Sequence, residues 1–224
     1  NGTAVRSGAF NWDITLNYAY NQSRIVELAP TVAEISLGSG IQGARIVNRP
    51  GLPYGTVMVI QPKHTADGTP IYNSISHFPE GEEVAFGVGN PPHTVGLTNN
   101  FRLGNFSLNV LLDGKFGAVG YHNLMFYATR FGLTPMTLEG RESGLQLDGV
   151  DENGNPFSYL WEPQNLQAYY NQLGRGYSAL FTYKTDFVKL RRAVFSYNIP
   201  VNGLKFIRLQ SASIGLVANN LLIL

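Results

Sequence analysis

Large apolar and polar side chains alternate strictly along residues 10 to 21. Most of the intervening positions carry asparagine, aspartate or threonine. A period of two predicts a β-strand with one apolar face, and the run is as long as the roughly 9 to 11 residues that a transmembrane strand needs. The apolar positions of this strand are Trp12, Ile14, Leu16, Tyr18 and Tyr20.

The same alternation occurs on both sides of Gly104-Asn105, along residues 94 to 103 and 106 to 113. A two-residue connection that begins with glycine supplies the positive φ of a primed hairpin turn. We therefore expect an antiparallel hairpin here. The pattern alone fits a strand in a membrane wall and a half-buried strand in a soluble β-sandwich equally well.

Seven strands are expected in total. Short turns are expected at Gly104-Asn105, at residues 201 to 203 and, as a third, at Asp67-Gly68, and long connections at residues 24 to 53, 77 to 93 and 118 to 184. Along residues 185 to 198 the apolar phase shifts between Leu190 and Phe195, which predicts either a β-bulge or a rise of the strand above the rim of a membrane. The expected strands lie near residues 11 to 23, 54 to 64, 69 to 76, 94 to 103, 106 to 117, 185 to 198 and 204 to 218.

Composition favours an all-β protein with many turns. Charged residues make up 14% of the 224-residue chain, against about 25% in average soluble domains, and there are 25 glycines. No window of 18 apolar residues is present, which excludes a transmembrane helix. The net charge of +1 gives no support for nucleic-acid binding. Without cysteine, disulfides and thiolate zinc sites are excluded.

Several motifs resemble one family in wording and in order. Residues 187 to 200 read FVKLRRAVFSYNIP, residues 89 to 102 read GNPPHTVGLTNNFR, and residues 111 to 115 read LLDGK. These segments, together with Asn11-Trp12-Asp13, are similar to the SusC/RagA family of TonB-dependent outer-membrane transporters. Arg192 departs from the glutamate that is usual in the family.

The resemblance implies a fold and a domain assignment. The chain would be about a third of the wall of a 22-stranded transmembrane β-barrel with short periplasmic turns and long extracellular loops. Residues 1 to 224 would be part of a single C-terminal barrel domain, and the N-terminal plug and the last strand, after Asn219-Asn220-Leu221, would lie outside it. Such a piece is not expected to fold stably alone, because its edges and its lipid-facing band would be exposed.

The resemblance also implies a function, a location and partners. The family imports nutrients through the bacterial outer membrane, so oligosaccharide or peptide ligands and outer-membrane lipid are implied partners. A SusD-like surface lipoprotein would cover the barrel mouth as a lid. The TonB complex would be engaged through an N-terminal region that these residues do not include.

The long connection after Ala118 combines aromatic and amide side chains, a mixture that suits stacking on sugar rings or peptide backbones. Packing within the loop, or an aromatic girdle at the membrane interface, is the simpler explanation of the mixture. Pro163 after Glu162 also predicts a short helix through Asn171 that ends at Gly174. The candidate contacts for substrate or lid are Tyr159, Trp161, Tyr169, Tyr170 and Tyr177.

Catalytic and cofactor motifs are weak. Residues 38 to 43 match the dinucleotide fingerprint formally, but prolines follow closely and no βαβ unit surrounds them. Asp148 and Asp151 with the asparagines that follow lack the spacing of a calcium loop, and a turn at Asn153-Gly154 explains them. The four histidines share no metal spacing. We therefore expect no enzyme activity, no cofactor, and no catalytic or metal-binding residue.

Two other classes remain open from the residues. The main alternative is a soluble secreted β-sandwich that binds carbohydrate, in which a second sheet would cover the apolar face of each strand. A porin or adhesin barrel without energy coupling shares the strand pattern, and only the family motifs disfavour it.

Overall fold

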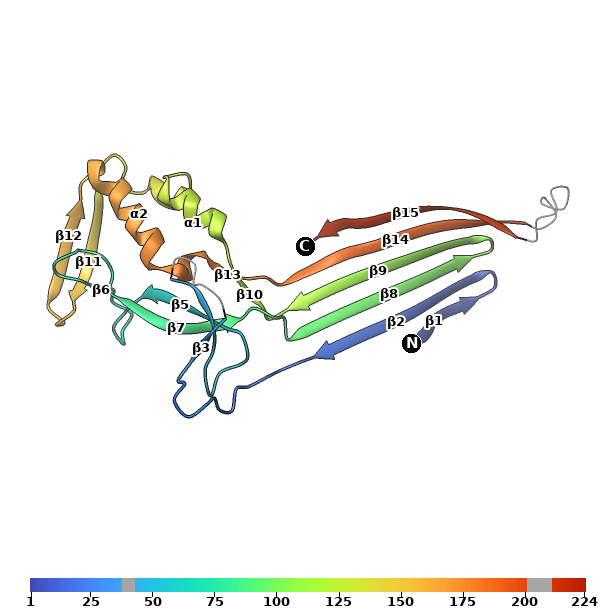
Figure 1. Cartoon of the computed structure of the whole chain (residues 1–224). Helices are drawn as coiled ribbons and strands as arrows, with labels where there is room; N and C mark the ends of the chain where they lie inside the picture. The colour runs from blue at the N-terminus through green and yellow to red at the C-terminus, as the bar shows by residue number, and fades with distance from the viewer. Residues whose placement is uncertain (38–42, 201–210) are drawn as a thin grey trace. The chain divides into compact units, whose positions relative to one another are not determined.

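The computed structural model describes residues 1–37, 43–200 and 211–224. The chain forms two compact units that alternate along the sequence (Figure 1). The first unit contains residues 1–22, 91–118 and 185–224, and the second contains residues 23–90 and 119–184. The fingerprint-like segment at residues 38–43 lies almost wholly outside the described residues.

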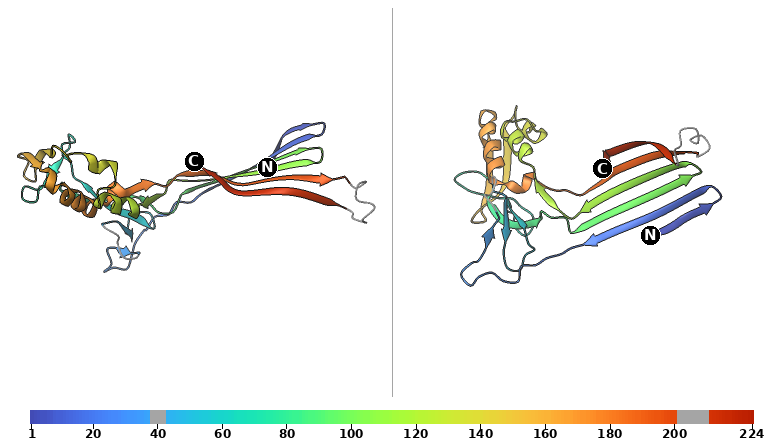
Figure 2. Two further views of the ribbon diagram at one scale, coloured as in Figure 1. Left: turned by 90° about the horizontal axis from the view of Figure 1, so that it is seen from above. Right: turned by 45° about the vertical axis from the view of Figure 1, so that its right-hand side comes forward.

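The first unit is a six-stranded antiparallel sheet, and Figure 2 shows its strands in a single layer. Strands that follow one another in this unit are neighbours in the sheet, as in a meander. In sheet order they are β1 (Gly2–Ser7), β2 (Phe10–Tyr20), β8 (His93–Leu103), β9 (Phe106–Phe116), β14 (Phe187–Ile199) and β15 (Ala212–Ile223).

The tight turns lie at one end of this sheet. β8 and β9 are joined by Gly104 and Asn105, with a φ of 57° at Gly104, which confirms the predicted hairpin. β1 and β2 are joined by a second two-residue turn, in which Gly8 has a φ of 55°. The two turns are adjacent, because the Gly104 amide donates to the Ala9 carbonyl at 3.1 Å. The turn predicted at residues 201 to 203 lies outside the described residues.

Two of the predicted wall strands were wrong. Residues 54 to 64 contain β5 (Thr56–Pro62) and residues 69 to 76 contain β6 (Ile71–Tyr72), but both strands belong to sheets of the second unit. A turn does form at Asp67-Gly68, where the Gly68 amide donates to Thr65, but it lies in the same unit and is not a turn of the wall. The sheet gains β1 instead, which the sequence pattern missed.

The predicted bulge in β14 is confirmed. Pairing with β9 shifts register between Leu190 and Arg192, so that Arg191 is the extra residue. Pairing with β15 shifts at the same place. The guanidinium of Arg191 bonds the carboxylate of Asp113 on β9, with the Nε–Oδ2 distance at 3.0 Å, and its Nη1 lies 3.3 Å from the Asn220 Oδ1. The last predicted strand, at 204 to 218, is β15, which runs from Ala212 to Ile223 within the described residues.

The second unit contains three small sheets and two helices. The unbroken connections expected at residues 24 to 53, 77 to 93 and 118 to 184 therefore contain secondary structure of their own. One sheet has the order β3 (Ile35–Ser36), β4 (Arg45–Asn48), β5 and β7 (Gly81–Val88); another has the order β12 (Pro156–Trp161), β11 (Leu145–Asp151) and β6; the third pairs β10 (Val119–Tyr121) with β13 (Thr182–Lys184).

The helices lie in the long connection between β9 and β14. They are α1 (Asn123–Arg130) and α2 (Leu166–Gly176), with 3-10 turns η1 (Pro135–Leu138), η2 (Pro163–Asn165) and η3 (Ser178–Phe181). The predicted helix at Pro163 is confirmed as η2 followed by α2, although α2 continues past Gly174. An added Cβ at Gly174 would lie 3.3 Å from Cγ of Arg130 and 3.5 Å from ring carbons of Phe126, so this glycine lies where α2 packs closely against α1. None of the described helices is long and apolar enough to cross a membrane.

Candidate functional site

The six-stranded sheet has one face without charge. One row of this face starts at Leu16 of β2 and continues through Leu97 of β8 to Leu112 of β9. A second row starts at Trp12 and continues through Phe101 to Leu108. The same rows continue through Leu190 and Phe195 of β14 to Leu222 and Leu216 of β15. We call this the apolar face. Its residues on the four central strands include Trp12, Ile14, Leu16, Tyr18, Val95, Leu97, Phe101, Phe106, Leu108, Val110, Leu112, Val188, Leu190, Ala193, Phe195 and Tyr197.

The apolar face is exposed. Leu16 is 61% exposed, Tyr18 is 60% exposed, and Leu216 is 76% exposed. The two buried apolar clusters among the described residues draw all their members from the second unit. The apolar face is therefore a large uncovered patch, which marks a surface for another molecule or a membrane.

Aromatic side chains form two belts across this face. Near the tight turns, Trp12 stacks on Phe101 with ring centroids 5.5 Å apart, and Phe106 lies 4.8 Å from Tyr197. At the other end, the rings of Tyr20 and His93 lie 4.8 Å apart. Aliphatic residues fill most of the band between the belts, with Asn99 beside Ile14 as a polar exception. Tyr20 lies eight positions after Trp12 along β2, which is about 26 Å at about 3.3 Å per residue.

Polar groups on the apolar face have partners. The Trp12 indole N–H donates to the Asn99 side chain at 3.1 Å, and the Tyr18 hydroxyl lies 2.8 Å from Nδ1 of His93. Both bonds satisfy polar atoms that would be costly to leave unpaired in an apolar medium. The strands therefore present a surface that can lose contact with water.

In the second unit, most of the predicted aromatic contacts form a core. The buried face of α2 consists of Leu166, Tyr169, Tyr170 and Leu173, at helical spacing, and it packs with Leu145 and Leu147 of β11. Tyr177 and Tyr72 complete this cluster, and Trp161 packs against it. The Tyr170 hydroxyl donates to the Glu139 carbonyl at 3.1 Å, and the Tyr177 hydroxyl donates to the Pro79 carbonyl.

Tyr159 lies at the margin of this cluster. Its ring stacks on the imidazole of His77, with centroids 3.7 Å apart, and meets Trp161 edge-on at 5.5 Å. His77 has a φ of 59°, which is rare for a residue with a side chain. The structure thus brings together all five predicted residues, with Tyr159 and Trp161 half-buried and the other three buried. Their role as contacts for substrate or lid stays a prediction. His77 was not among the candidates, and its sequence context carries no signal for this stacking.

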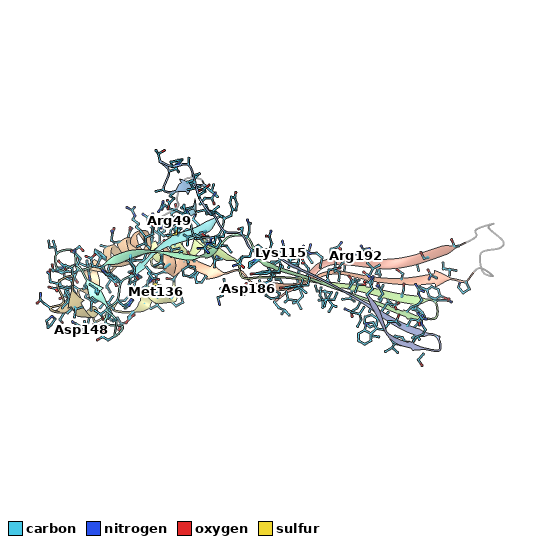
Figure 3. All side chains as sticks on the ribbon, turned by 90° about the horizontal axis from the view of Figure 1, so that it is seen from below. Arg49, Lys115, Met136, Asp148, Asp186 and Arg192 are labelled. Atoms are coloured by element: carbon cyan, nitrogen blue, oxygen red, sulfur yellow. The ribbon has the colours of Figure 1, made fainter. Side chains whose placement is uncertain are left out.

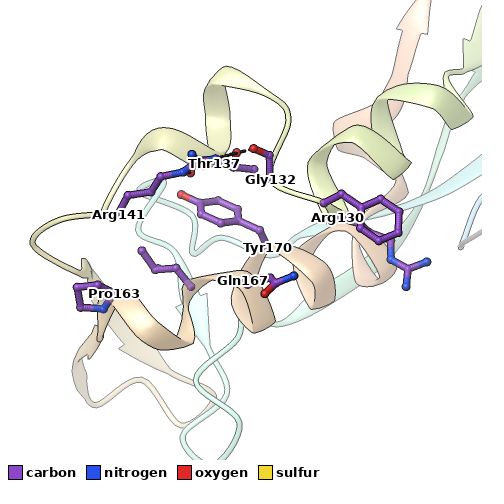
Figure 4. A pocket seen from close by; sticks show the side chains of 9 residues that line it. Arg130, Gly132, Thr137, Arg141, Pro163, Gln167 and Tyr170 are labelled. Atoms are coloured by element: carbon purple, nitrogen blue, oxygen red, sulfur yellow. Dashed lines mark hydrogen bonds between the residues drawn. The ribbon is translucent and has the colours of Figure 1, made fainter.

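A cavity of about 410 Å³ opens beside the cluster, between α2 and the η1 segment. Figure 4 shows Gln167 and Tyr170 on α2, with Arg141 and Thr137 nearby. Arg141 holds the loop: its Nε donates to the Thr137 carbonyl at 2.7 Å and its Nη2 to the Gly132 carbonyl at 2.5 Å. Two cationic side chains line the cavity, Arg130 and Arg141, and of these Arg141 is engaged by backbone oxygens.

The hairpin at Asn153-Gly154 is confirmed as a turn, with a φ of 85° at Gly154. The Asp151 carboxylate accepts hydrogen bonds from the backbone amides of Asn153 and Asn155, both at 2.8 Å. It also accepts one from the Asn155 side chain, which is the largest of the effects that lower the pKa of Asp151. In the described parts of the chain, no group of three or more histidine, aspartate or glutamate side chains is arranged to hold a metal ion.

Burial raises the pKa of the core tyrosines, in the case of Tyr177 to about 12 from an ordinary value of 10.0. The pKa of Tyr169 is raised as well, mainly by burial. Because folding favours the neutral hydroxyl, ionisation of these tyrosines lowers the free energy of unfolding. Their contribution to stability is fully present below pH 10 and is lost as the pH rises toward 12. We expect alkaline unfolding to coincide with a late rise in tyrosinate absorbance. Tyr177→Phe should remove one late-titrating group, and a titration complete by pH 10 with the fold intact would contradict the prediction.

Comparison with solved structures shows the same fold in a known transporter. The chain matches "Structure of the RagAB peptide transporter" with a TM-score of 0.63, and the RagAB peptide importer in its closed-closed and open-open states with TM-scores of 0.66 each. Sequence identity is 16% in all three, and the match covers 100% of this chain. The chain shares its fold with part of RagAB.

The likeness to RagAB has defined limits. This chain spans about a quarter of the length of the matched RagAB chains, with 24% covered in two structures and 25% in the third. At this identity the likeness to RagAB concerns the fold. No protein-family model matches the chain, and no curated protein matches it. The sequence resemblance to the SusC/RagA family and the structural likeness to RagAB thus agree on a transporter-related fold.

Proposed function

We propose that this chain forms part of the barrel wall and outer loops of a TonB-dependent importer in the bacterial outer membrane. The importer would take up oligosaccharides or peptides together with a SusD-like lipoprotein lid, and the chain would have no enzyme activity. The observation that carries this proposal is the uncharged, exposed apolar face of the six-stranded sheet.

The dimensions of the apolar face support a position in lipid. Outer-membrane barrels carry an outward apolar band about 25 Å tall between two aromatic girdles. The belts around Trp12 and Tyr20 bound a band of about 26 Å, at about 3.3 Å per residue. Tight turns at one end and the two long connections at the other match periplasmic turns and extracellular loops.

The free edges of the sheet support closure into a barrel. The strands β1 and β15 each pair with one neighbour in the described residues. Unpaired backbone groups are not tolerated in hydrocarbon, and a closed barrel satisfies them by pairing each edge with a further strand. Six strands of a 22-stranded barrel would be about a quarter of its wall.

The second unit would stand outside the membrane, where a lid and a ligand bind. Tyr159 and Trp161 are half-buried and would offer ring edges, whereas Tyr169, Tyr170 and Tyr177 would hold α2 in place beneath them. In this proposal the five aromatic residues act together, two by contact and three by support.

The β-sandwich alternative predicts the opposite environment for the apolar face. A soluble carbohydrate-binding sandwich packs its two sheets about 10 Å apart, so residues such as Leu16 would be covered by side chains of a second sheet. The 61% exposure of Leu16 does not fit that arrangement.

Site-directed spin labelling tests the proposal. Single cysteines at Leu16 and at the neighbouring Thr15 place one label on each face of β2, and the 224 residues contain no other cysteine. In the protein reconstituted in bilayers, we expect the Leu16→Cys label to be relaxed by lipid-soluble oxygen and the Thr15→Cys label by a water-soluble nickel complex. A Leu16 label that neither reagent reaches would indicate a covered core, and the transporter proposal would fail.

A further inference from the structure

All charged residues of the six strands lie on the face opposite the apolar face, which we call the charged face. They comprise six cations and two anions. Pairing places most of them directly, and the bulged Arg191 reaches the same face because it bonds Asp113. The charged face therefore has an excess of four positive charges. Its charged residues are Arg6, Asp13, Arg102, Asp113, Lys115, Lys189, Arg191 and Arg192.

Three of the cations form what we call the basic cluster: Lys115, Lys189 and Arg192. They occupy three successive rows of the charged face, because Lys115 pairs with Phe187, Asp113 with Lys189, and Leu111 with Arg192. Figure 3 labels Lys115 and Arg192 on this sheet. Successive rows of one face are two residues apart, which is about 7 Å at about 3.4 Å per residue.

The basic cluster has no anionic partner within the described residues. Two carboxylates lie near the basic cluster along the sheet, and both are engaged elsewhere: Asp113 pairs with Arg191, and Asp186 accepts the Gly117 amide at 2.6 Å. Lys189 instead lies with its Nζ 5.5 Å from the centre of the Phe187 ring. Arg192 is exposed, and Lys115 and Lys189 are half-buried. Three unneutralised cations at this spacing create a positive potential that favours an anionic ligand.

We propose that the basic cluster binds acidic peptides in an extended conformation, an inference that rests on the proposed transporter function. A peptide in this conformation presents every second side chain on one side, with a repeat of about 7 Å. This repeat matches the rows that hold Lys115, Lys189 and Arg192. Carboxylates at alternate peptide positions would then each meet one cation, so the site selects cargo by charge and by spacing.

The test measures peptide binding to the intact membrane protein in detergent. One probe is a peptide with glutamate at alternate positions, and its reference is the same peptide with glutamine. We expect Lys115→Gln, Lys189→Gln and Arg192→Gln together to weaken binding of the acidic peptide roughly tenfold and to leave the glutamine peptide unchanged. The difference between the two peptides should shrink at high salt.

Two further variants sharpen the test. Arg6→Gln with Arg102→Gln removes two cations near the tight turns of the same face and should change acidic-peptide binding far less than the triple variant does. Asp113→Asn removes the competing anion beside Lys189 and should strengthen binding of the acidic peptide.

Each outcome has a defined meaning. If the triple substitution leaves the affinity for both peptides unchanged, the basic cluster is not the site and the transporter proposal stands. If an acidic oligosaccharide of matched charge binds more tightly than the glutamate peptide, selection by peptide spacing is overturned. If a lower unfolding midpoint is the only change in the triple variant, the cluster serves an internal contact and the inference falls. If label accessibility contradicts a lipid-facing β2, the transporter proposal itself fails.

Discussion

Replacing Phe126 by alanine should lower the free energy of unfolding by about 3 to 5 kcal/mol, the usual loss for a large aromatic residue in a core. Phe126 is 0% exposed and joins three segments of the second unit. Its ring meets Phe181 edge-on at 5.9 Å and lies against Gly174 of α2. Truncation would leave a void between α1, α2 and η3, which packed neighbours fill only in part.

Urea-induced unfolding of the purified protein in detergent, followed by near-ultraviolet circular dichroism, would measure this loss. The matched control is Leu124→Ala on the same helix, where the side chain is 72% exposed and a change within about 0.5 kcal/mol is expected. Equal effects of the two substitutions would show that α1 does not pack as described.

In the lipid-facing position proposed for the apolar face, Leu16→Arg should destabilise the protein in a bilayer by about 2 to 4 kcal/mol, the cost of an arginine on the lipid face near the midplane of a membrane barrel. Leu16 lies midway between the belts at Trp12 and Tyr20, where the guanidinium cannot easily reach water. Reversible unfolding from lipid vesicles is the measurement.

Thr15→Arg is the control for this second substitution. Thr15 is the preceding residue of β2 and points to the charged face, where an arginine stays hydrated. Its cost should therefore be close to zero. A Thr15→Arg variant that loses as much stability as Leu16→Arg would contradict the assignment of the two faces.

The sequence predicted the wall strands with a clear period of two. The alternation through Leu16, the Gly104-Asn105 turn and the phase shift after Leu190 each correspond to a feature of the sheet. These features are local, because side-chain period and turn chemistry act over a few residues.

The missed assignments arise where the pattern of a strand does not reveal which sheet the strand joins. In β5 the residues Val57, Met58 and Val59 are all buried, so a continuous apolar run replaced the alternation, and nothing local distinguished a wall strand from a strand of a small separate sheet. β1 has little apolar content, and all six of its residues are exposed. Gly8, two residues before Phe10, was the one signal that could have indicated its hairpin.

The aromatic site was only partly readable. Sequence spacing predicted the helix that carries Tyr169 and Tyr170, and the aromatic composition marked the right segment. The partners came from far along the chain: Tyr72 and Phe78 belong to the other long connection, and their contacts with Phe157 and Tyr169 depend on tertiary packing.

The core of the second unit mixes residues from two insertions into the six-stranded sheet, since Tyr72 and Pro79 come from one and Leu147 and Tyr177 from the other. Each insertion buries part of its apolar surface in this shared cluster only against residues of the other. An evolutionary exchange or a laboratory graft that replaces one insertion alone would thus pair mismatched halves. The two should be inherited, and transplanted, as a single exchangeable cassette, with the six-stranded sheet serving as a constant frame.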